Sequence, residues 1–317
     1  MSRIITVVVM TYNQKKYISK TLDSILTQKG DIDFNIIIHD DCSNDGTSEI
    51  VKEYQKKYSD IITLVEEKER KFLKEGFNMM IFNHVVPLID SKYVAYCDGD
   101  DYWCDEYKLK KQLDFMENNQ NYSMCFHCAY QLKNNDDLSS KWFMGDEADV
   151  DMSFIISENP GIKIATSSLF VKSDVFKDFP DWRKKYPVED IPLYINAAMN
   201  GQIHRLSDVM CVYRQFSSGS WSSQNKDDTQ KMIDHLTKMM DAVRCFNEQS
   251  EGAYQQLVSK QLVSFEFRIA LLKKDYKTIF LEKYKNLYRQ LSKRERISLK
   301  LQYKAPRLYN LIHRKKK

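Results

Sequence analysis

The chain has 317 residues, 43% of them hydrophobic and 12% aromatic, which is enough for the core of one large domain or two ordinary ones. It has no run of 18 or more apolar residues, so we expect no membrane-spanning helix, and its first residues lack a signal-peptide pattern. The net charge is +4, yet residues 273–317 hold sixteen Lys or Arg and three Asp or Glu, so a basic tail follows an acidic body. The seven cysteines are scattered and odd in number, which favours reduced thiols in a cytoplasmic protein.

Apolar runs and amphipathic stretches alternate over the first hundred residues. We expect strands at residues 4–11, 34–39, 61–65 and 93–97. The helices between them are expected at residues 16–28, 47–58 and 76–90. This alternation predicts an α/β fold in which helices cover both faces of a parallel sheet.

The pattern becomes less regular farther along the chain. It predicts helices at residues 108–117 and 191–200, strands at residues 123–131, 165–171 and 202–213, and a polar excursion at residues 134–160. From about residue 226 onward the chain has a helical pattern with few turn signals. We therefore expect a first domain over residues 1–220 and a helical C-terminal region over residues 226–317.

Polar clusters follow three of the expected strands. They are Thr11-Tyr12-Asn13, Asp40-Asp41 and Asp98-Gly99-Asp100-Asp101. Ligands of parallel sheets bind beyond the carboxyl ends of the strands, so the three clusters are expected to share one rim. Three neighbouring carboxylates raise one another's pKa unless a cation neutralises them, and a divalent metal completed by phosphate oxygens is a natural neutraliser.

Each cluster also has a purely structural interpretation. The acidic run after residue 97 could be a solvated turn, and residues 40–47 could form a capped turn before a helix. Acidic residues at 189 and 190 complement the N-terminus of the expected helix that follows them. The polar residues 166–168 either line a binding site or form a strand edge. The residues alone leave these alternatives open.

Four motifs in order along the chain resemble those of family-two glycosyltransferases. They are VVVMTYN at residues 7–13, LDSILTQ at 22–28, DDCSNDGT at 40–47 and DGDDYW at 98–103. The resemblance covers roughly residues 3–220. It implies a GT-A fold, which is a Rossmann-like nucleotide-binding sheet flanked by helices, here with a helical C-terminal extension. It also implies a nucleotide-sugar donor, with a UDP-sugar favoured, a divalent metal (Mn²⁺ or Mg²⁺) and inversion at the anomeric carbon.

The resemblance assigns a nucleoside pocket to the first two clusters. Thr11 and Tyr12 would line it, with Tyr12 stacking on the base. Asp41 would accept a hydrogen bond from the base, and Asp40 would support the loop. Arg70 would lie near the base or the diphosphate, although a solvated charge run over residues 66–71 explains it as well.

The remaining site residues carry the expected chemistry. Asp98 would meet the ribose, Asp100 would ligate the metal, and Asp98 and Asp101 would complete the acidic metal site. Asp190 would be the general base that activates the acceptor hydroxyl, and Arg214 would pair with the diphosphate, since a guanidinium matches phosphate geometry.

The C-terminal segment interleaves Leu, Tyr and Ile with Lys and Arg over residues 299–317. Such a basic amphipathic segment fits an anionic membrane surface, a solvated tail or nucleic acid, but no nucleic-acid motif accompanies it. We therefore expect a cytoplasmic enzyme, peripheral on the inner face of the plasma membrane, that transfers a sugar to a glycan or lipid-linked acceptor in surface polysaccharide synthesis. The alternatives are a nucleotidyltransferase-like nucleotide-binding enzyme and a non-catalytic degenerate domain.

Overall fold

The computed structural model describes residues 3–133, 137–143, 145–156, 164–188, 190–215, 228–307 and 309, with the side chains of residues 133 and 137–143 not described. The chain divides into two compact units, residues 1–227 and residues 228–317. Each unit has its own architecture, and the boundary falls where the sequence changes from alternating elements to helices.

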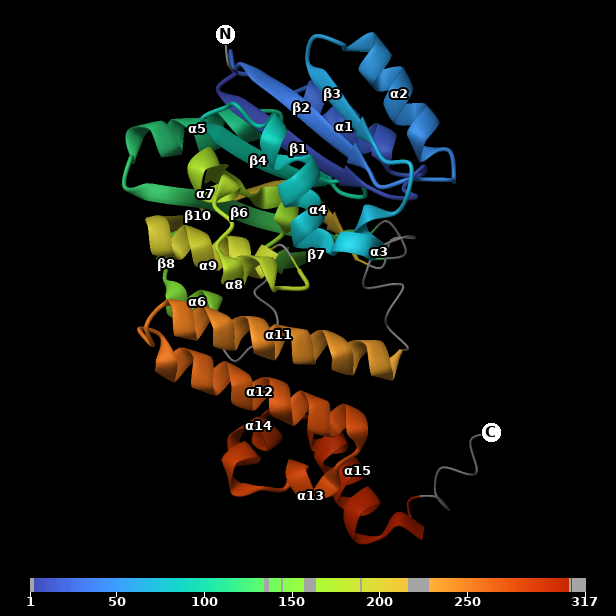
Figure 1. Ribbon diagram of the computed structural model, residues 1–317, viewed down its shortest axis with the longest axis vertical. Coiled ribbons are helices and arrows are strands. Elements are labelled where there is room, and N and C mark those ends of the chain that lie inside the picture. Colours follow the sequence, from blue (N-terminus) through green and yellow to red (C-terminus); the bar gives the residue numbers. More distant parts are fainter. Residues whose placement is uncertain are drawn as a thin grey trace. The chain divides into compact units, whose positions relative to one another are not determined.

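The first unit is built on one mixed sheet (Figure 1). Its strand order is β3-β2-β1-β4-β9-β6-β10-β5, with β7 added beside β6 and β8 beside β10. The strands are β1 (Ile5–Thr11), β2 (Phe34–Asp40), β3 (Ile62–Glu66), β4 (Tyr93–Asp98), β5 (Tyr102–Trp103), β6 (Tyr122–Lys133), β7 (Asp137–Phe143), β8 (Ala148–Val150), β9 (Phe170–Lys172) and β10 (Gln202–Arg214). The first four strands of the path are parallel, and β9 joins them antiparallel to both β4 and β6.

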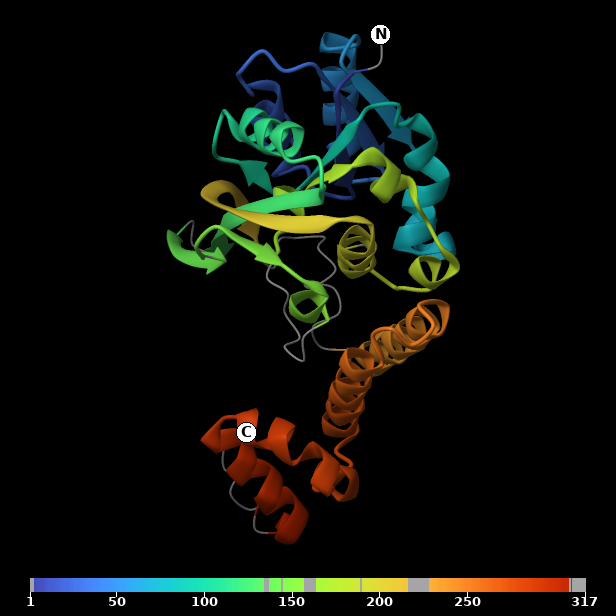
Figure 2. The same ribbon diagram turned by 90° about the vertical axis from the view of Figure 1, so that its left-hand side faces the viewer.

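Helices cover both faces of this sheet, as Figure 2 shows from the side. One face packs α1 (Ile18–Leu26), α2 (Thr47–Lys57) and α5 (Lys108–Asn118) on buried side chains of the central strands such as Val7 and Val9. The helical segments farther along this unit are α6 (Met152–Ile155), α7 (Ser173–Lys177), α8 (Asp181–Lys184) and α9 (Asp190–Asn200). Every residue of β1 is buried, as expected for the central strand of a sheet covered on both sides. The predicted α/β fold is therefore confirmed.

Two predicted elements differ from the structure. The single helix expected at residues 76–90 is shorter in the structure: it is α4 (Phe77–His84), followed by the 3₁₀ turn η1 (Val86–Leu88), and the helix α3 (Lys71–Glu75) before it was not expected. Gly76 separates α3 from α4 with φ of 78°, which a residue inside a helix does not adopt, and Pro87 lies within η1.

The strand expected at residues 165–171 is replaced by the 3₁₀ turn η2 (Thr166–Ser168) and the short strand β9. Two backbone carbonyls of this segment accept hydrogen bonds from side chains. Trp103 Nε1 donates to Ser167 O at 3.0 Å, and Gln112 Nε2 donates to Ser168 O at 2.9 Å. Because these carbonyls accept from side chains, they are not available to a longer strand ladder.

The second unit is helical. It contains α11 (Thr229–Gln249), α12 (Gln255–Lys273), α13 (Tyr276–Ile279), the turn η3 (Glu282–Tyr284), α14 (Lys285–Gln290) and α15 (Lys293–Lys304). A small core around Phe267, Ala270, Ile279 and Tyr284 joins α12 to the shorter helices. Among the described residues, no helix combines the length and the apolar character needed to cross a membrane.

Candidate functional site

The loops that follow β1, β2 and β4 lie against one another at the carboxyl rim of the sheet. The N–H of Asp41 donates to the carbonyl of Thr11 at 3.1 Å, and the N–H of Gly99 donates to the carbonyl of Met10 at 2.9 Å. A Cβ at Gly99 would lie 2.4 Å from Gln14 Oε1 and 2.9 Å from Thr11 Oγ1, so only glycine permits this close approach. The structure thus brings the three polar clusters of the sequence to one rim.

The loop after β2 is held by short polar contacts. Asp40 is buried, and its carboxylate accepts from the N–H of Ser43 at 3.2 Å and from the hydroxyls of Ser43 and Ser48. The next carboxylate along the loop, Asp45, accepts from the N–H of Thr47 at 3.0 Å, at the first residue of α2. Asp40 therefore shapes the loop from within.

Asp41, Arg70 and Tyr12 form one cluster beside this loop. Arg70 Nε donates to Asp41 Oδ2 at 2.8 Å, and the N–H of Lys71 donates to Asp41 Oδ1 at 2.6 Å. The guanidinium carbon of Arg70 lies 3.3 Å from the centre of the Tyr12 ring. Arg70 is thus packed between two predicted nucleoside-site residues and is not part of a solvated charge run.

Thr11 occupies a different place from its predicted neighbours. Its side chain is buried beneath Gly99, and its hydroxyl donates to Gln14 Oε1 at 2.8 Å. It supports the rim from below, whereas Tyr12 lies at the surface of the rim and is partly exposed.

The acidic run after β4 is fixed through Asp101. This side chain is fully buried, and its two oxygens are taken by protein donors: Ser167 Oγ donates to Oδ2 at 2.7 Å and the N–H of Arg214 donates to Oδ1 at 2.8 Å. Ser167 Oγ also accepts from the N–H of Asp98 at 3.3 Å. Asp101 therefore joins the ends of β4, η2 and β10.

Arg214, the last residue of β10, also contacts the acidic loop after β4 through its side chain. Its Nη1 donates to the backbone carbonyl of Asp100, and its guanidinium carbon lies 4.8 Å from the ring centre of Tyr102 and 4.9 Å from that of Tyr17. The guanidinium is therefore placed next to the acidic loop, where a diphosphate could reach it.

Asp190 lies within electrostatic reach of this loop. It begins α9, and its Oδ1 accepts from the N–H of Ile191 at 2.8 Å. Burial, together with the negative charges of Asp100 and Asp190, raises the pKa of Asp98 to about 8. Burial also raises the pKa of Asp190 itself. The start of α9 and the end of β4 therefore bring three carboxylates into one region.

A cation would relieve the repulsion among these groups. Among the described residues, no set of three or more His, Cys, Asp or Glu side chains forms a preformed metal cluster. A divalent ion held by one or two carboxylates and completed by substrate phosphate oxygens needs no such cluster. The pair Asp98 and Asp100 fits that requirement, because each carboxylate raises the energy of the other until a cation binds.

The sequence assigns no role to Tyr213 in this region, and it leaves Ser167 either in the lining of a binding site or at a strand edge. Burial raises the pKa of the Tyr213 phenol, and the negative charges of Asp101, Asp98, Asp100 and Asp190 raise it further. Ser167 is fully buried beneath the acidic loop and does not line an acceptor surface. Position directly before Arg214 was the only signal for Tyr213, and nothing in the sequence distinguished Ser167 from its neighbouring hydroxyl residues.

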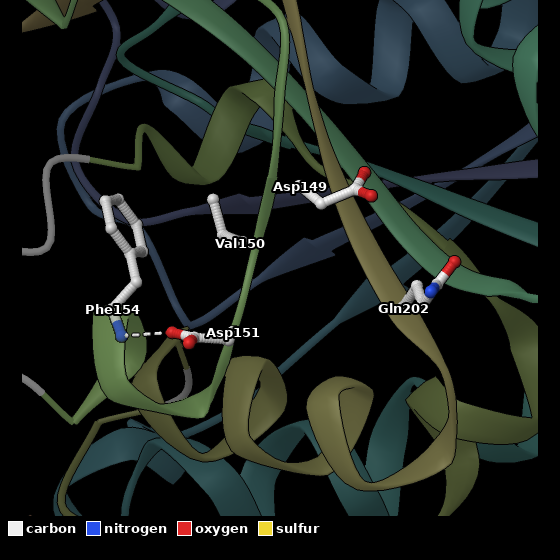
Figure 3. Close-up of a pocket in the computed structure, with 5 residues that line it drawn as sticks. All are labelled: Asp149, Val150, Asp151, Phe154 and Gln202. Carbon is white, nitrogen blue, oxygen red and sulfur yellow. Dashed lines mark hydrogen bonds between the residues drawn. The ribbon is translucent and has the colours of Figure 1, made fainter.

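A separate hollow lies at the other end of β10 (Figure 3). It is lined by Asp149, Val150, Asp151, Phe154 and Gln202, and Asp151 Oδ1 accepts from the N–H of Phe154 at 2.9 Å as the cap of α6. Gln202 begins β10, whereas Arg214 ends it, so this hollow is distinct from the carboxyl rim. It contains none of the predicted site residues.

Comparison with known proteins gives consistent matches. A family model described as Glycosyl transferase family 2 matches residues 6–176. An uncharacterized protein of Mycobacterium tuberculosis is 28% identical over 227 residues, which is 70% of this chain and 62% of that protein. The putative teichuronic acid biosynthesis glycosyltransferase TuaG of Bacillus subtilis is 34% identical over 114 residues, 36% of this chain and 42% of TuaG. This chain thus spans less than two thirds of the length of either relative.

A solved structure shares the fold. Residues 1–349 of TarS from S. aureus, in complex with UDP-GlcNAc, match with a TM-score of 0.58 and 18% sequence identity. The match covers 93% of this chain and 77% of that one. The predicted GT-A fold with its helical C-terminal region is therefore confirmed.

Proposed function

The chain belongs to glycosyl transferase family 2, and we propose that it is a metal-dependent inverting glycosyltransferase. It would move a sugar from a nucleotide-sugar, with a UDP-sugar as the favoured donor, to a hydroxyl of a glycan or lipid-linked acceptor in surface polysaccharide synthesis. The observation that carries the proposal is that the negative charges of Asp100 on the acidic loop and of Asp190 at the start of α9 both raise the pKa of the buried Asp98 carboxyl. Residues 1–220 would form the catalytic domain, and residues 226–317 would form a helical region that follows it in the chain.

The Tyr12, Asp41 and Arg70 cluster is the proposed nucleoside site. A flat guanidinium already lies on the Tyr12 ring, so this ring face accepts a planar group at van der Waals distance. Asp41 accepts from Arg70, Lys71 and Phe72, which fixes its carboxylate at the edge of that face. A base that stacks on Tyr12 would take the place of the guanidinium and donate to Asp41, and Arg70 would then turn toward the diphosphate.

Asp100 and Asp98 are the proposed holders of a divalent ion, Mn²⁺ or Mg²⁺. Such an ion supplies positive charge to the diphosphate as it leaves. Arg214 adds a second cation beside the same loop. The two oxygens of Asp101 already accept from Ser167 and Arg214, so we assign Asp101 to positioning the loop and not to ligation.

Asp190 is the proposed general base. Its carboxylate would accept the proton of the acceptor hydroxyl while the acceptor oxygen forms a bond to the anomeric carbon. The bond from that carbon to the diphosphate oxygen breaks in the same step, so the configuration inverts. A positioned base contributes roughly 10²–10⁴-fold to such a step, and a raised pKa makes Asp190 a stronger base than an ordinary carboxylate.

The similarity to TuaG supports an acceptor in surface polysaccharide synthesis. A lipid-linked acceptor would bring the enzyme to the inner face of the plasma membrane, where the cytoplasmic donor and the acceptor meet. The charges of the C-terminal region are compatible with that location.

A donor panel tests the proposal. Purified protein is incubated with UDP-, GDP- and dTDP-sugars in Mn²⁺ or Mg²⁺, with and without chelator and with candidate acceptors, and nucleoside diphosphate release is measured. We expect release from a UDP-sugar that chelator abolishes and that Asp100→Ala removes, while the surface variant Asp60→Ala keeps it. Release of pyrophosphate from a nucleoside triphosphate would favour a nucleotidyltransferase. Unchanged glycan synthesis in cells carrying Asp100→Ala would favour a non-catalytic domain.

A further inference from the structure

Helix α15 packs on the small core of the second unit. Leu299 contacts the small core of this unit, and the ring of Tyr303 lies 5.1 Å from that of Phe280. Gln302 accepts from the hydroxyl of Tyr276 at 2.7 Å. A capping box between Ser292 and Glu295 fixes the start of the helix. These contacts set which side of α15 faces inward.

The opposite side of α15 combines cations with apolar side chains. At 3.6 residues per turn, positions 293, 294, 297, 300, 301 and 304 fall on the side away from Leu299. Ile297 is 49% exposed there, and Leu301 next to it is only partly buried. Lys293, Arg294, Lys300 and Lys304 surround these two residues and are all exposed. We call these six residues the α15 outer face.

The cations of this face have no acidic partner within the part of the chain that the structure describes. Other cations of the same unit do: Lys283 Nζ lies 2.8 Å from Glu266 Oε2, and Lys285 Nζ lies 2.6 Å from Glu282 Oε1. The acidic residue of α15 itself, Glu295, is engaged in the capping box. The positive charge of the outer face is therefore left for an external anionic partner.

We propose that the α15 outer face lies flat on an anionic lipid bilayer. Phosphate groups on a soluble polymer or a nucleic acid would satisfy the four cations but would leave Ile297 and Leu301 in water. A bilayer satisfies both kinds of side chain, because its headgroups are anionic and its acyl boundary accepts apolar residues. Exposed Ile297 beside the partly buried Leu301, with cations around both, is thus the observation that favours a lipid surface.

This inference deepens the proposed function, which brings the enzyme to a lipid-linked acceptor, but it rests on a different part of the chain. Binding to vesicles requires neither donor nor metal. A failure of the donor panel and a failure of vesicle binding would therefore be separate results.

Sedimentation with vesicles tests the inference on the full chain. The vesicles are phosphatidylcholine alone or phosphatidylcholine with 30–40% phosphatidylglycerol, at low and at physiological salt. We expect binding to the anionic vesicles only, weakened by salt. Lys293→Gln/Lys300→Gln should weaken it by about 25-fold, since each basic residue near such a surface contributes a factor of about five.

Matched variants separate this face from general charge and from the tail. Lys56→Gln/Lys57→Gln changes the net charge equally on exposed residues of α2 and should leave binding within about twofold. Ile297→Gln should weaken binding without any change in charge, whereas Leu88→Gln, at an exposed leucine of the first unit, should not. The inference is overturned if the α15 variants bind like the wild type, or if deletion of residues 308–317 alone abolishes binding.

Discussion

The backbone N–H of Arg214 donates to Oδ1 of Asp101 at 2.8 Å, so the end of β10 is tied to the acidic loop after β4. The guanidinium of the same arginine donates to the carbonyl of Asp100. Arg214 thus places its guanidinium beside Asp100, the proposed metal ligand, and its backbone N–H also holds the acidic loop. Asp100 and Asp101 are both buried, and the contacts of Asp101 with Ser167 and Arg214 hold the acidic loop in place.

Asp101→Asn and Asp101→Ala separate positioning from ligation. Asparagine can still accept from the N–H of Arg214 and pair with Ser167, so we expect a loss of activity below about tenfold and little change in the Mn²⁺ concentration for half-maximal activity. Alanine leaves the N–H of Arg214 and the Ser167 hydroxyl without their acceptor, which costs about 1–3 kcal/mol of unfolding free energy for each. Thermal unfolding and Mn²⁺ titrations of activity provide the readouts. A large increase in the Mn²⁺ requirement of the asparagine variant would make Asp101 a ligand.

Arg70→Ala tests the proposed nucleoside site. It removes the ion pair of a buried carboxylate and the cation that we assign to the diphosphate, so UDP binding measured by calorimetry should weaken at least tenfold. Arg70→Lys should recover only part of this loss, because an ammonium lacks the planar shape that packs on Tyr12. Arg3→Ala, at a surface ion pair with Asp33, is the control and should bind UDP normally. Unchanged or tighter binding by Arg70→Ala would place the base elsewhere.

The raised pKa of Asp98 predicts how stability depends on pH. The folded protein holds this proton up to about pH 8, whereas the unfolded chain releases it near pH 4. Folded protein therefore binds more protons between these values, so its unfolding free energy falls as the pH rises from about 4 to 8. The melting temperature of the metal-free protein should fall over this range, and Asp98→Asn should flatten the fall.

Binding of Mn²⁺ and UDP should oppose this fall of the unfolding free energy with rising pH. A cation favours the ionised carboxylates, so ligand-induced stabilisation should increase as the pH approaches 8. Melting curves at pH 6 and pH 8, with and without Mn²⁺ and UDP, measure it. Equal ligand stabilisation at both pH values would contradict the assignment of Asp98 to the charged site.

Asp190→Asn tests the general base. The amide keeps the size of the side chain but cannot accept a proton, so kcat should fall roughly 10²–10⁴-fold while the Kd for UDP stays within about twofold. Asp181→Asn is the matched control, because Asp181 is an exposed acidic residue in the first turn of α8 and should keep full activity. A loss of UDP binding together with activity would indicate that Asp190 serves the donor and not the acceptor.

Much of the fold could be predicted because the sequence carries a local signal for it. Buried strands such as β1 are continuous apolar runs, and their carboxyl ends carry the polar residues that define the rim. The division of residues 71–88 and the turn η2 were not predictable from periodicity. They depend on the backbone angle of Gly76 and on side chains such as Trp103 and Gln112, which reach carbonyls far away in sequence.

The candidate site shows the same contrast. Motif order could indicate Asp41, Asp100 and Asp190, but it could not show that the two oxygens of Asp101 accept hydrogen bonds from Ser167 and Arg214. Those partners lie more than sixty residues away along the chain. Long-range contacts therefore show which carboxylate holds the loop in place, and the sequence alone does not.

The most direct test of the central claim is the structure of the full chain with a UDP-sugar, or its non-hydrolysable analogue, and Mn²⁺. We predict that the base stacks on Tyr12, that Asp100 contacts the ion on the diphosphate, and that the anomeric carbon faces Asp190 from the side opposite the diphosphate. A nucleotide bound in the hollow lined by Asp149 and Gln202, or an Asp190 carboxylate on the far side of the sheet from the sugar, would contradict the account.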